Sequence, residues 1–132
     1  MIASADRFLR FWTPVIIWMA FIFTLSSIPG RHFKHIHIFG ADKIVHLVEF
    51  LILGLLLIRA FLNTSSLDTA RAIIICVVLA TIYAVSDEWH QSFVKDRTAD
   101  IFDFITDFIG LNAGILMYRK KGSFDDAGDK TL

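Results

Sequence analysis

Four long apolar stretches divide the chain, and each approaches the length of about 20 residues that a helix needs to cross a bilayer. They run from about residue 11 to 28, 44 to 62, 70 to 86 and 101 to 118. The first stops at Pro29-Gly30 and the second at the polar run 63–66, both signals that end helices. The pattern predicts an all-α, polytopic membrane protein, a bundle of four transmembrane helices.

A soluble helical bundle is the main alternative to this interpretation. A helix at the surface of a soluble protein shows a polar face every 3.6 residues, and the segments Leu51–Ile58 and Ala72–Ala84 show none. The first stretch is too long for a cleaved signal peptide and lacks a small-x-small cleavage site, which favours an uncleaved anchor. We therefore expect a membrane domain over residues 1–122 and a polar, disordered tail over residues 123–132.

Composition agrees with the pattern. Of the 132 residues, 55% are hydrophobic, against about 45–50% in soluble domains. The length suits one compact unit. The formal net charge is zero, so the chain lacks the basic surplus that nucleic-acid binding requires. Its single cysteine, Cys76, cannot form an intrachain disulfide.

Lysine and arginine predict the orientation. With the N-terminus inside, eight of these residues flank the inner ends of the helices: Arg7, Arg10, Arg59, Arg71, Arg119, Lys120, Lys121 and Lys130. Five lie outside: Arg31, Lys34, Lys43, Lys95 and Arg97. Positively charged loops stay in the cytoplasm. We therefore expect a multi-pass protein of the cell membrane with both termini in the cytoplasm.

Ionisable residues gather near three helix ends. The second stretch begins with Asp42, Lys43, His46 and Glu49, and the third ends with Asp87, Glu88 and Gln91. Arg97 and Asp100 precede the fourth stretch, which carries Asp103 and Asp107 in its first two turns. Spacings of three and four residues place three sets on shared helical faces: Asp42, His46 and Glu49; Asp87 and Gln91; Asp103 and Asp107. Since these three helix ends lie at one membrane face, which is the outer face in the predicted orientation, the sequence predicts one polar cluster there.

Three roles are open for this cluster. It could be a packing network that fixes helix register through hydrogen bonds and ion pairs. It could be catalytic, with His46 and a carboxylate of Glu49, Asp87 or Glu88 as an acid–base pair. Arg97, with Lys43 or Lys95, could then hold a phosphate or carboxylate. Asp107, deeper in the fourth helix, is expected to pair with Arg97 or His46.

Metal binding is the third role. The donors would be His46 with Asp87, Glu88 and Asp103, or the loop histidines His32, His35 and His37. No zinc motif of standard spacing occurs, so the sequence assigns no metal ligand and leaves the cofactor open.

Several of these residues form recognisable blocks. They are Leu25-Ser26-Ser27-Ile28-Pro29, then Asp42-Lys43-x-x-His46 with Leu53-Gly54, then Ser86-Asp87-Glu88-x-x-Gln91-x-Phe93 with Arg97, Asp103 and Gly110. Together the blocks resemble the VanZ-like family of small bacterial membrane proteins, over roughly residues 20 to 116. Two positions depart from the family pattern: Phe50 stands where tyrosine is frequent, and Asp107 where asparagine is usual.

The resemblance implies a site and a place of action. It assigns catalysis to His46, Asp87, Glu88 and Asp103, and substrate binding to Asp42, Lys43, Gln91 and Arg97. The family takes its name from a protein linked to teicoplanin resistance, which suggests the cell envelope and antibiotic resistance. Membrane lipids or lipid-linked envelope precursors are the expected partners, and a homo-oligomer is possible.

Three functions compete at this point. The first is a membrane-embedded hydrolase of a lipid-linked or phosphate-bearing substrate. The second is a non-catalytic binder of a glycopeptide or lipid headgroup, or of another membrane protein. A proton-coupled transporter is the third, although charges confined to one end of four helices leave little room for two gates. The sequence does not decide whether the protein is an enzyme.

The predicted orientation can be tested with a reporter domain fused after the last residue, Leu132. We expect a reporter that works only in the cytoplasm to be active, because the excess of lysine and arginine at the inner ends keeps the C-terminal segment on the cytoplasmic side. A signal from the extracytoplasmic side would reverse the orientation.

Overall fold

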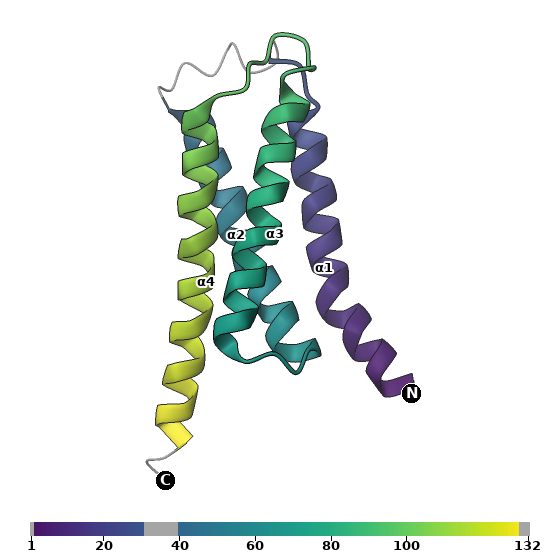
Figure 1. The fold of residues 1–132 in the computed structure, drawn as a ribbon, viewed down its shortest axis with the longest axis vertical. Helices are drawn as coiled ribbons and strands as arrows, with labels where there is room; N and C mark the ends of the chain where they lie inside the picture. Colours follow the sequence, from purple (N-terminus) through teal and green to yellow (C-terminus); the bar gives the residue numbers. More distant parts are fainter. Residues whose placement is uncertain (1, 31–39, 130–132) are drawn as a thin grey trace.

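The computed structural model describes residues 2–30 and 40–129 of the chain. Four helices account for most of these residues: α1 (Ile2–Ser26), α2 (Ala41–Thr64), α3 (Thr69–Gln91) and α4 (Ile101–Asp129). They run alternately up and down (Figure 1). Each contains a segment long and apolar enough to cross a membrane. The predicted all-α bundle of four transmembrane helices is confirmed.

The helices extend beyond the predicted apolar stretches, chiefly at the start of α1, which begins at Ile2, and at the ends of α3 and α4. α3 continues to Gln91, so the polar residues at its end are helical. α4 continues to Asp129, whereas the sequence places a disordered tail from residue 123. No proline interrupts residues 119–129, and their two glycines, Gly122 and Gly128, each cost only about 1 kcal/mol relative to alanine inside a helix. The division of the chain at residue 122 stays a prediction.

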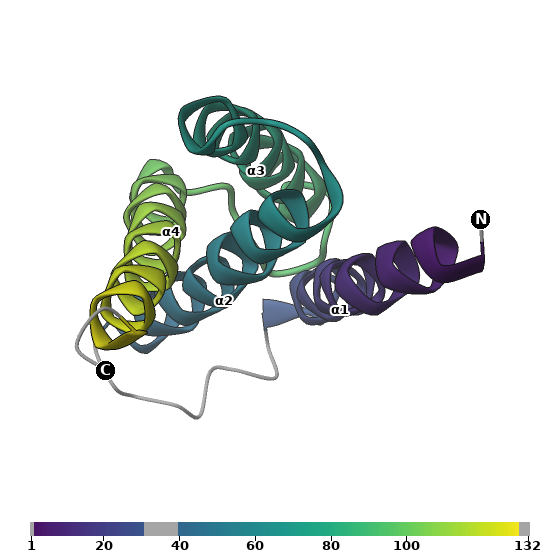
Figure 2. The same ribbon diagram turned by 90° about the horizontal axis from the view of Figure 1, so that it is seen from below.

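The second helix is the centre of the bundle. Seen from below, α2 lies between α4 and α1, with α3 to one side (Figure 2). It contacts all three other helices, and most extensively α4. α1 leans away from the bundle toward its N-terminus (Figure 1). Pro14 lies at the middle of α1, where its ring removes one backbone hydrogen bond.

Glycine residues bring the backbones of α2 and α4 into direct contact. A Cβ atom on Gly110 would collide with the backbone carbonyl of Leu47, and one on Gly114 with that of Leu51. Gly54 of α2 meets the backbone of Leu111 in the same way. Small residues permit such close approach between membrane helices. This contact sets which residues of α2 and α4 face each other toward the polar end.

The remaining core is apolar, and so is the outer surface. α3 turns a stripe of small buried residues inward, spaced four apart: Ala72, Cys76, Ala80 and Ala84. Larger buried side chains fill the centre, among them Ile22, Phe50, Leu53 and Ile58. Large hydrophobic residues also lie exposed on every helix, including Ile16, Val48, Ile82 and Ile105. Such a surface suits contact with lipid chains, which are as apolar as leucine.

The end of α1 is attached to the loop between α3 and α4. The backbone N–H of Gly30 donates a hydrogen bond to the carbonyl of Lys95 at 3.1 Å. A Cβ atom at Gly30 would collide with the backbone of Asp96, which itself has a positive φ of 62°. This close crossing holds residues 95–97 above the ends of α1 and α3.

The glycine contact makes a direct prediction about stability. Gly114→Val should lower the free energy of unfolding by about 1–3 kcal/mol, because its side chain forces α2 and α4 apart. Unfolding of the purified protein in mixed micelles measures the change. Ile109→Val, on the exposed face of α4, is the control and should change stability by less than about 0.5 kcal/mol. Equal stability of the two variants would show that the helices do not meet at Gly114.

Candidate functional site

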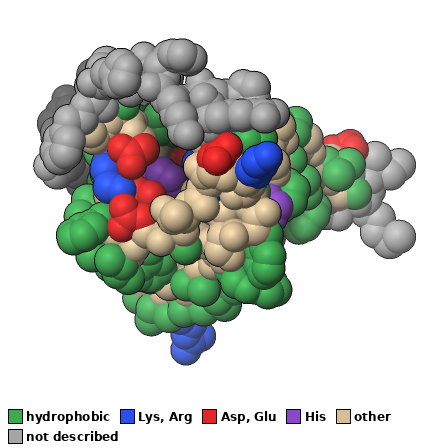
Figure 3. Space-filling view, turned by 90° about the horizontal axis from the view of Figure 1, so that it is seen from above, with side chains coloured by type: hydrophobic (Ala, Val, Ile, Leu, Met, Phe, Trp, Pro, Cys, Tyr) green, Lys and Arg blue, Asp and Glu red, His purple; other side chains and the backbone are tan. Residues whose placement is uncertain are grey.

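The polar cluster lies at the end of the bundle where α1 and α3 finish and α2 and α4 begin. Viewed from this end, charged side chains of both signs and a histidine gather around a hollow (Figure 3). The eight residues assigned from the sequence all belong to this end: Asp42, Lys43, His46, Asp87, Glu88, Gln91, Arg97 and Asp103. Five of them are buried: His46, Asp87, Glu88, Gln91 and Asp103. The side chains of the cluster form three groups, each joined by hydrogen bonds or ion pairs.

The first group surrounds Lys43, which is half-buried on the first turn of α2. Its ammonium donates to Asp103 at 2.5 Å, to Asp100 at 2.7 Å and to Asp42 at 3.1 Å. The Lys43 ammonium beside Asp100 holds the pKa of that exposed carboxyl below its usual range. The Lys43 ammonium thus bonds three carboxylates of the protein itself. Through Asp100 and Asp103, these bonds join the start of α2 to the start of α4.

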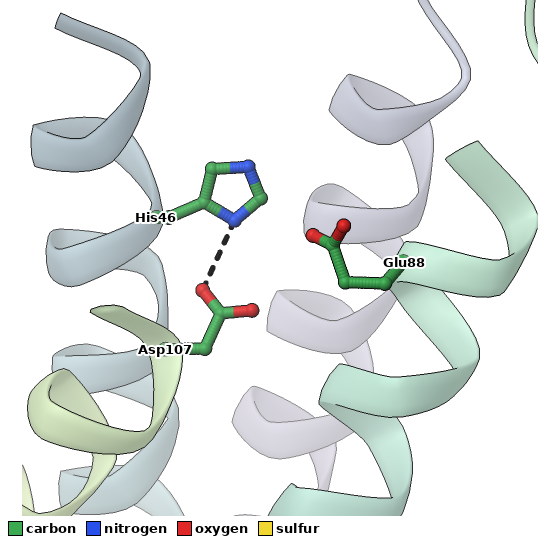
Figure 4. A group of neighbouring side chains, drawn as sticks. All are labelled: His46, Glu88 and Asp107. Atoms are coloured by element: carbon green, nitrogen blue, oxygen red, sulfur yellow. Dashed lines mark hydrogen bonds and ion pairs between the residues drawn. The ribbon is translucent and has the colours of Figure 1, made fainter. Parts of the chain in front are cut away.

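The second group, called here the His46 group, consists of His46, Glu88 and Asp107. A hydrogen bond of 3.0 Å joins His46 Nδ1 to Asp107 Oδ1. Glu88 approaches from α3, and its Oε2 accepts the backbone N–H of Asp100 at 2.9 Å. All three functional groups point into one shared space from three different helices (Figure 4). Of the two partners that the sequence leaves open for Asp107, the structure selects His46.

The third group links α1, α3 and the loop after it. Asp87 Oδ2 accepts hydrogen bonds from Ser26 Oγ at 2.8 Å and from Gln91 Nε2 at 2.9 Å. The guanidinium of Arg97 donates to Gln91 Oε1 at 3.3 Å and to the backbone carbonyls of Leu25 and Ile28, both at 3.1 Å. Arg97 is thereby held in a fixed position above the end of α1.

A cavity of about 460 Å³ opens between these groups. Asp42, His46 and Glu49 line it from α2. Ser26, Gln91 and Arg97 line it from the ends of α1 and α3 and from the loop. Leu25 and Val45 add apolar surface. The cavity therefore places an imidazole and carboxylates near a guanidinium, in a space large enough for a small polar molecule.

Three residues of the site were not assigned from the sequence. Glu49 lies on the cavity wall, and its spacing of three from His46 already indicated a shared face. Asp107 is fully buried against His46, and its spacing of four from Asp103 was the available signal. Ser26 donates a hydrogen bond to Asp87. Its only signal in the sequence was its place in the block Leu25-Ser26-Ser27-Ile28-Pro29.

The structure also bears on the two metal sites considered from the sequence. Of the set His46, Asp87, Glu88 and Asp103, Asp103 Oδ2 lies 4.0 Å from His46 Nε2, while Asp103 Oδ1 and Asp87 Oδ2 accept hydrogen bonds from Lys43 and Gln91. Among the described residues, the donors that converge are instead His46, Glu88 and Asp107. The loop histidines His32, His35 and His37 lie outside the described residues.

Comparison with known proteins now assigns the family. Neither a curated protein nor a solved structure matches the chain at a significant level. The family model described as VanZ/LLP1 matches residues 11–122, a range that includes the cluster, most of the first membrane-spanning segment and the other three in full. The similarity first indicated by short blocks thus extends over most of the chain, which belongs to the VanZ/LLP1 family of membrane proteins.

Proposed function

We propose that this protein is a membrane-embedded hydrolase that acts on a lipid-linked, phosphate-bearing substrate of the bacterial cell envelope. The cavity at the polar end of the bundle carries this proposal. It combines His46 and Glu49 on one wall with Arg97 on the other. Pockets of a few hundred Å³ with a few convergent polar groups are typical of small-molecule sites.

The position of the cavity favours a substrate with a polar head and an apolar chain. It lies where the apolar spans end, which corresponds to the headgroup region of a bilayer. Val45 lines the cavity and is about half exposed at 49%. A headgroup could therefore occupy the cavity while its chain lies along the apolar outer surface of the helices.

The side chains suit hydrolysis of a phosphate ester. In this reaction a water oxygen bonds to phosphorus, the bond from phosphorus to the lipid-linked oxygen breaks, and the proton from water passes to that leaving oxygen. Arg97 matches the planar, bidentate geometry of phosphate. The His46 group supplies the imidazole and carboxylates that activate water. Asp87 and Asp103 act as positioning residues, through Gln91 and Lys43.

A non-catalytic binder is the second candidate, and the extensive bonding of the cations favours it. Lys43 is surrounded by three carboxylates, and Arg97 is fixed by two carbonyls and Gln91. A rigid set of this kind would suit recognition of a headgroup or glycopeptide without turnover, as antibiotic tolerance by sequestration would require.

The experiment is phosphate release by the detergent-purified protein from a panel of lipid phosphates. His46→Ala should lower the rate by about 100-fold or more, because general acid–base groups contribute about 10²–10⁴. His90→Ala is the matched control: His90 bonds Ser27 and stacks on Phe23, away from the cavity, so release should persist.

Other outcomes decide between the candidates. No release, together with saturable lipid-phosphate binding that Arg97→Gln weakens, would replace the hydrolase by the binder. Neither release nor binding would contradict both. Phosphate release that persists in the His46→Ala variant would show that His46 is not a catalytic residue of this reaction.

A further inference from the structure

The His46 group has the composition and geometry of a metal site. One nitrogen of His46 and one oxygen each of Glu88 and Asp107 lie within 4.8 Å of one another. The three side chains are nearly inaccessible, with 4%, 8% and 0% of their surface exposed. They extend from α2, α3 and α4 toward the same point (Figure 4). An ion placed there would contact all three helices at once.

Two oxygen atoms of this group lack a partner. Glu88 Oε1 and Asp107 Oδ2 are buried and find no hydrogen bond within the part of the chain that the structure describes. An unsatisfied buried polar atom destabilises the folded state, and more so when it carries charge. Each of the two carboxyl groups thus has one oxygen bonded, to His46 or to the backbone of Asp100, and one available. These are the atoms that an ion would engage.

The surrounding charges also favour a cation. Five carboxyl groups are buried at this end of the bundle: Glu49, Asp87, Glu88, Asp103 and Asp107. The ammonium of Lys43 is directed to Asp42, Asp100 and Asp103, and does not bond Glu88 or Asp107. Buried carboxylates are stable when paired or bound to a metal. A divalent ion would compensate the two carboxylates of the His46 group.

We propose that His46, Glu88 and Asp107 bind one divalent transition-metal ion of the zinc or manganese kind. An imidazole with two carboxylates suits both ions, which accept nitrogen and oxygen ligands. Bonds of about 2.0–2.2 Å separate tetrahedral ligand atoms by about 3.3–3.6 Å. On binding an ion, the Glu88 and Asp107 side chains would move to shorten the present spacing of up to 4.8 Å to this value.

The ion gives the site a specific chemistry. Three protein ligands leave a coordination position open, as in catalytic zinc sites. Since His46 also lines the cavity, that position is accessible to water or to a phosphate oxygen. A bound ion would polarise both and offset the negative wall that an anionic headgroup meets. This role of the ion deepens the proposed function and rests on it, whereas binding of the ion does not.

The test is direct binding of Mn²⁺ and Zn²⁺ to the full-length, detergent-purified protein after chelator treatment. Calorimetry with Zn²⁺ and electron paramagnetic resonance with Mn²⁺ should each show one ion per chain. Glu88→Gln and Asp107→Asn should weaken binding at least about tenfold, since even outer partners of metal ligands contribute about 10–100-fold. Asp68→Asn, an exposed carboxylate that caps the opposite end of α3, is the control and should retain the affinity within about threefold, since asparagine caps a helix as well as aspartate.

Several results would overturn the site. Absence of binding would do so, as would binding that both ligand variants leave unchanged. Loss of the ion on substitution of His35 or His37 would place it elsewhere. If the variants do not fold, pulsed resonance of Mn²⁺ on the unaltered protein decides: coupling to one imidazole nitrogen supports the site, and no nitrogen coupling excludes it.

The two proposals fail separately. Ion binding without phosphate release from any lipid would retain the metal site and reject the hydrolase. Phosphate release that persists in chelator, with no ion bound, would retain the hydrolase and reject the metal site.

Discussion

The backbone contact between α2 and α4 is the constraint on which the rest of the structure depends. Gly54, Gly110 and Gly114 have no side chain at the crossing, so the two helices approach until backbone atoms touch. In a membrane, helix association cannot rely on the exclusion of water and depends on such close packing and on hydrogen bonds. Because this contact fixes register, the start of α2 faces the start of α4, and the Lys43 and His46 groups can form.

Burying the charged side chains at the polar end of the bundle costs free energy, and hydrogen bonds and ion pairs offset most of that cost. Charged side chains at the centre of a membrane helix cost about 2.5–3.5 kcal/mol each on insertion scales, and less toward its ends. Here they are confined to one end and mostly bonded in three groups. Within residues 2–30 and 40–129, the exceptions are single oxygens of Glu49, Asp87, Glu88 and Asp107, which have no hydrogen-bond partner there. A purely structural network would be expected to satisfy these atoms, so their concentration beside the cavity favours a site that receives something from outside.

Membership of the VanZ/LLP1 family assigns the fold, whereas function depends on the site. The acidic side chains of Asp42 and Glu49 on the α2 wall would repel an anionic headgroup, and Arg97 stands on the other side of the cavity. A cation bound by the His46 group would reconcile this acidic wall with a phosphate-bearing substrate. Both proposals therefore depend on which positive charge compensates the buried carboxylates next to the cavity.

The sequence by itself determined the four helices, their membrane character and the end of the bundle at which the polar residues meet. These follow from local information: the length of apolar runs, the breaks at Pro29-Gly30 and 63–66, and the alternation of helix direction. Spacing also placed Asp87 with Gln91 on one face, as their hydrogen bond confirms. Only the tertiary structure decided that Asp107 pairs with His46, that Lys43 is occupied by carboxylates, and that Glu49 lines the cavity. Such pairings depend on how deeply glycines let two helices approach and how each is rotated, and no periodicity within a single helix contains that information.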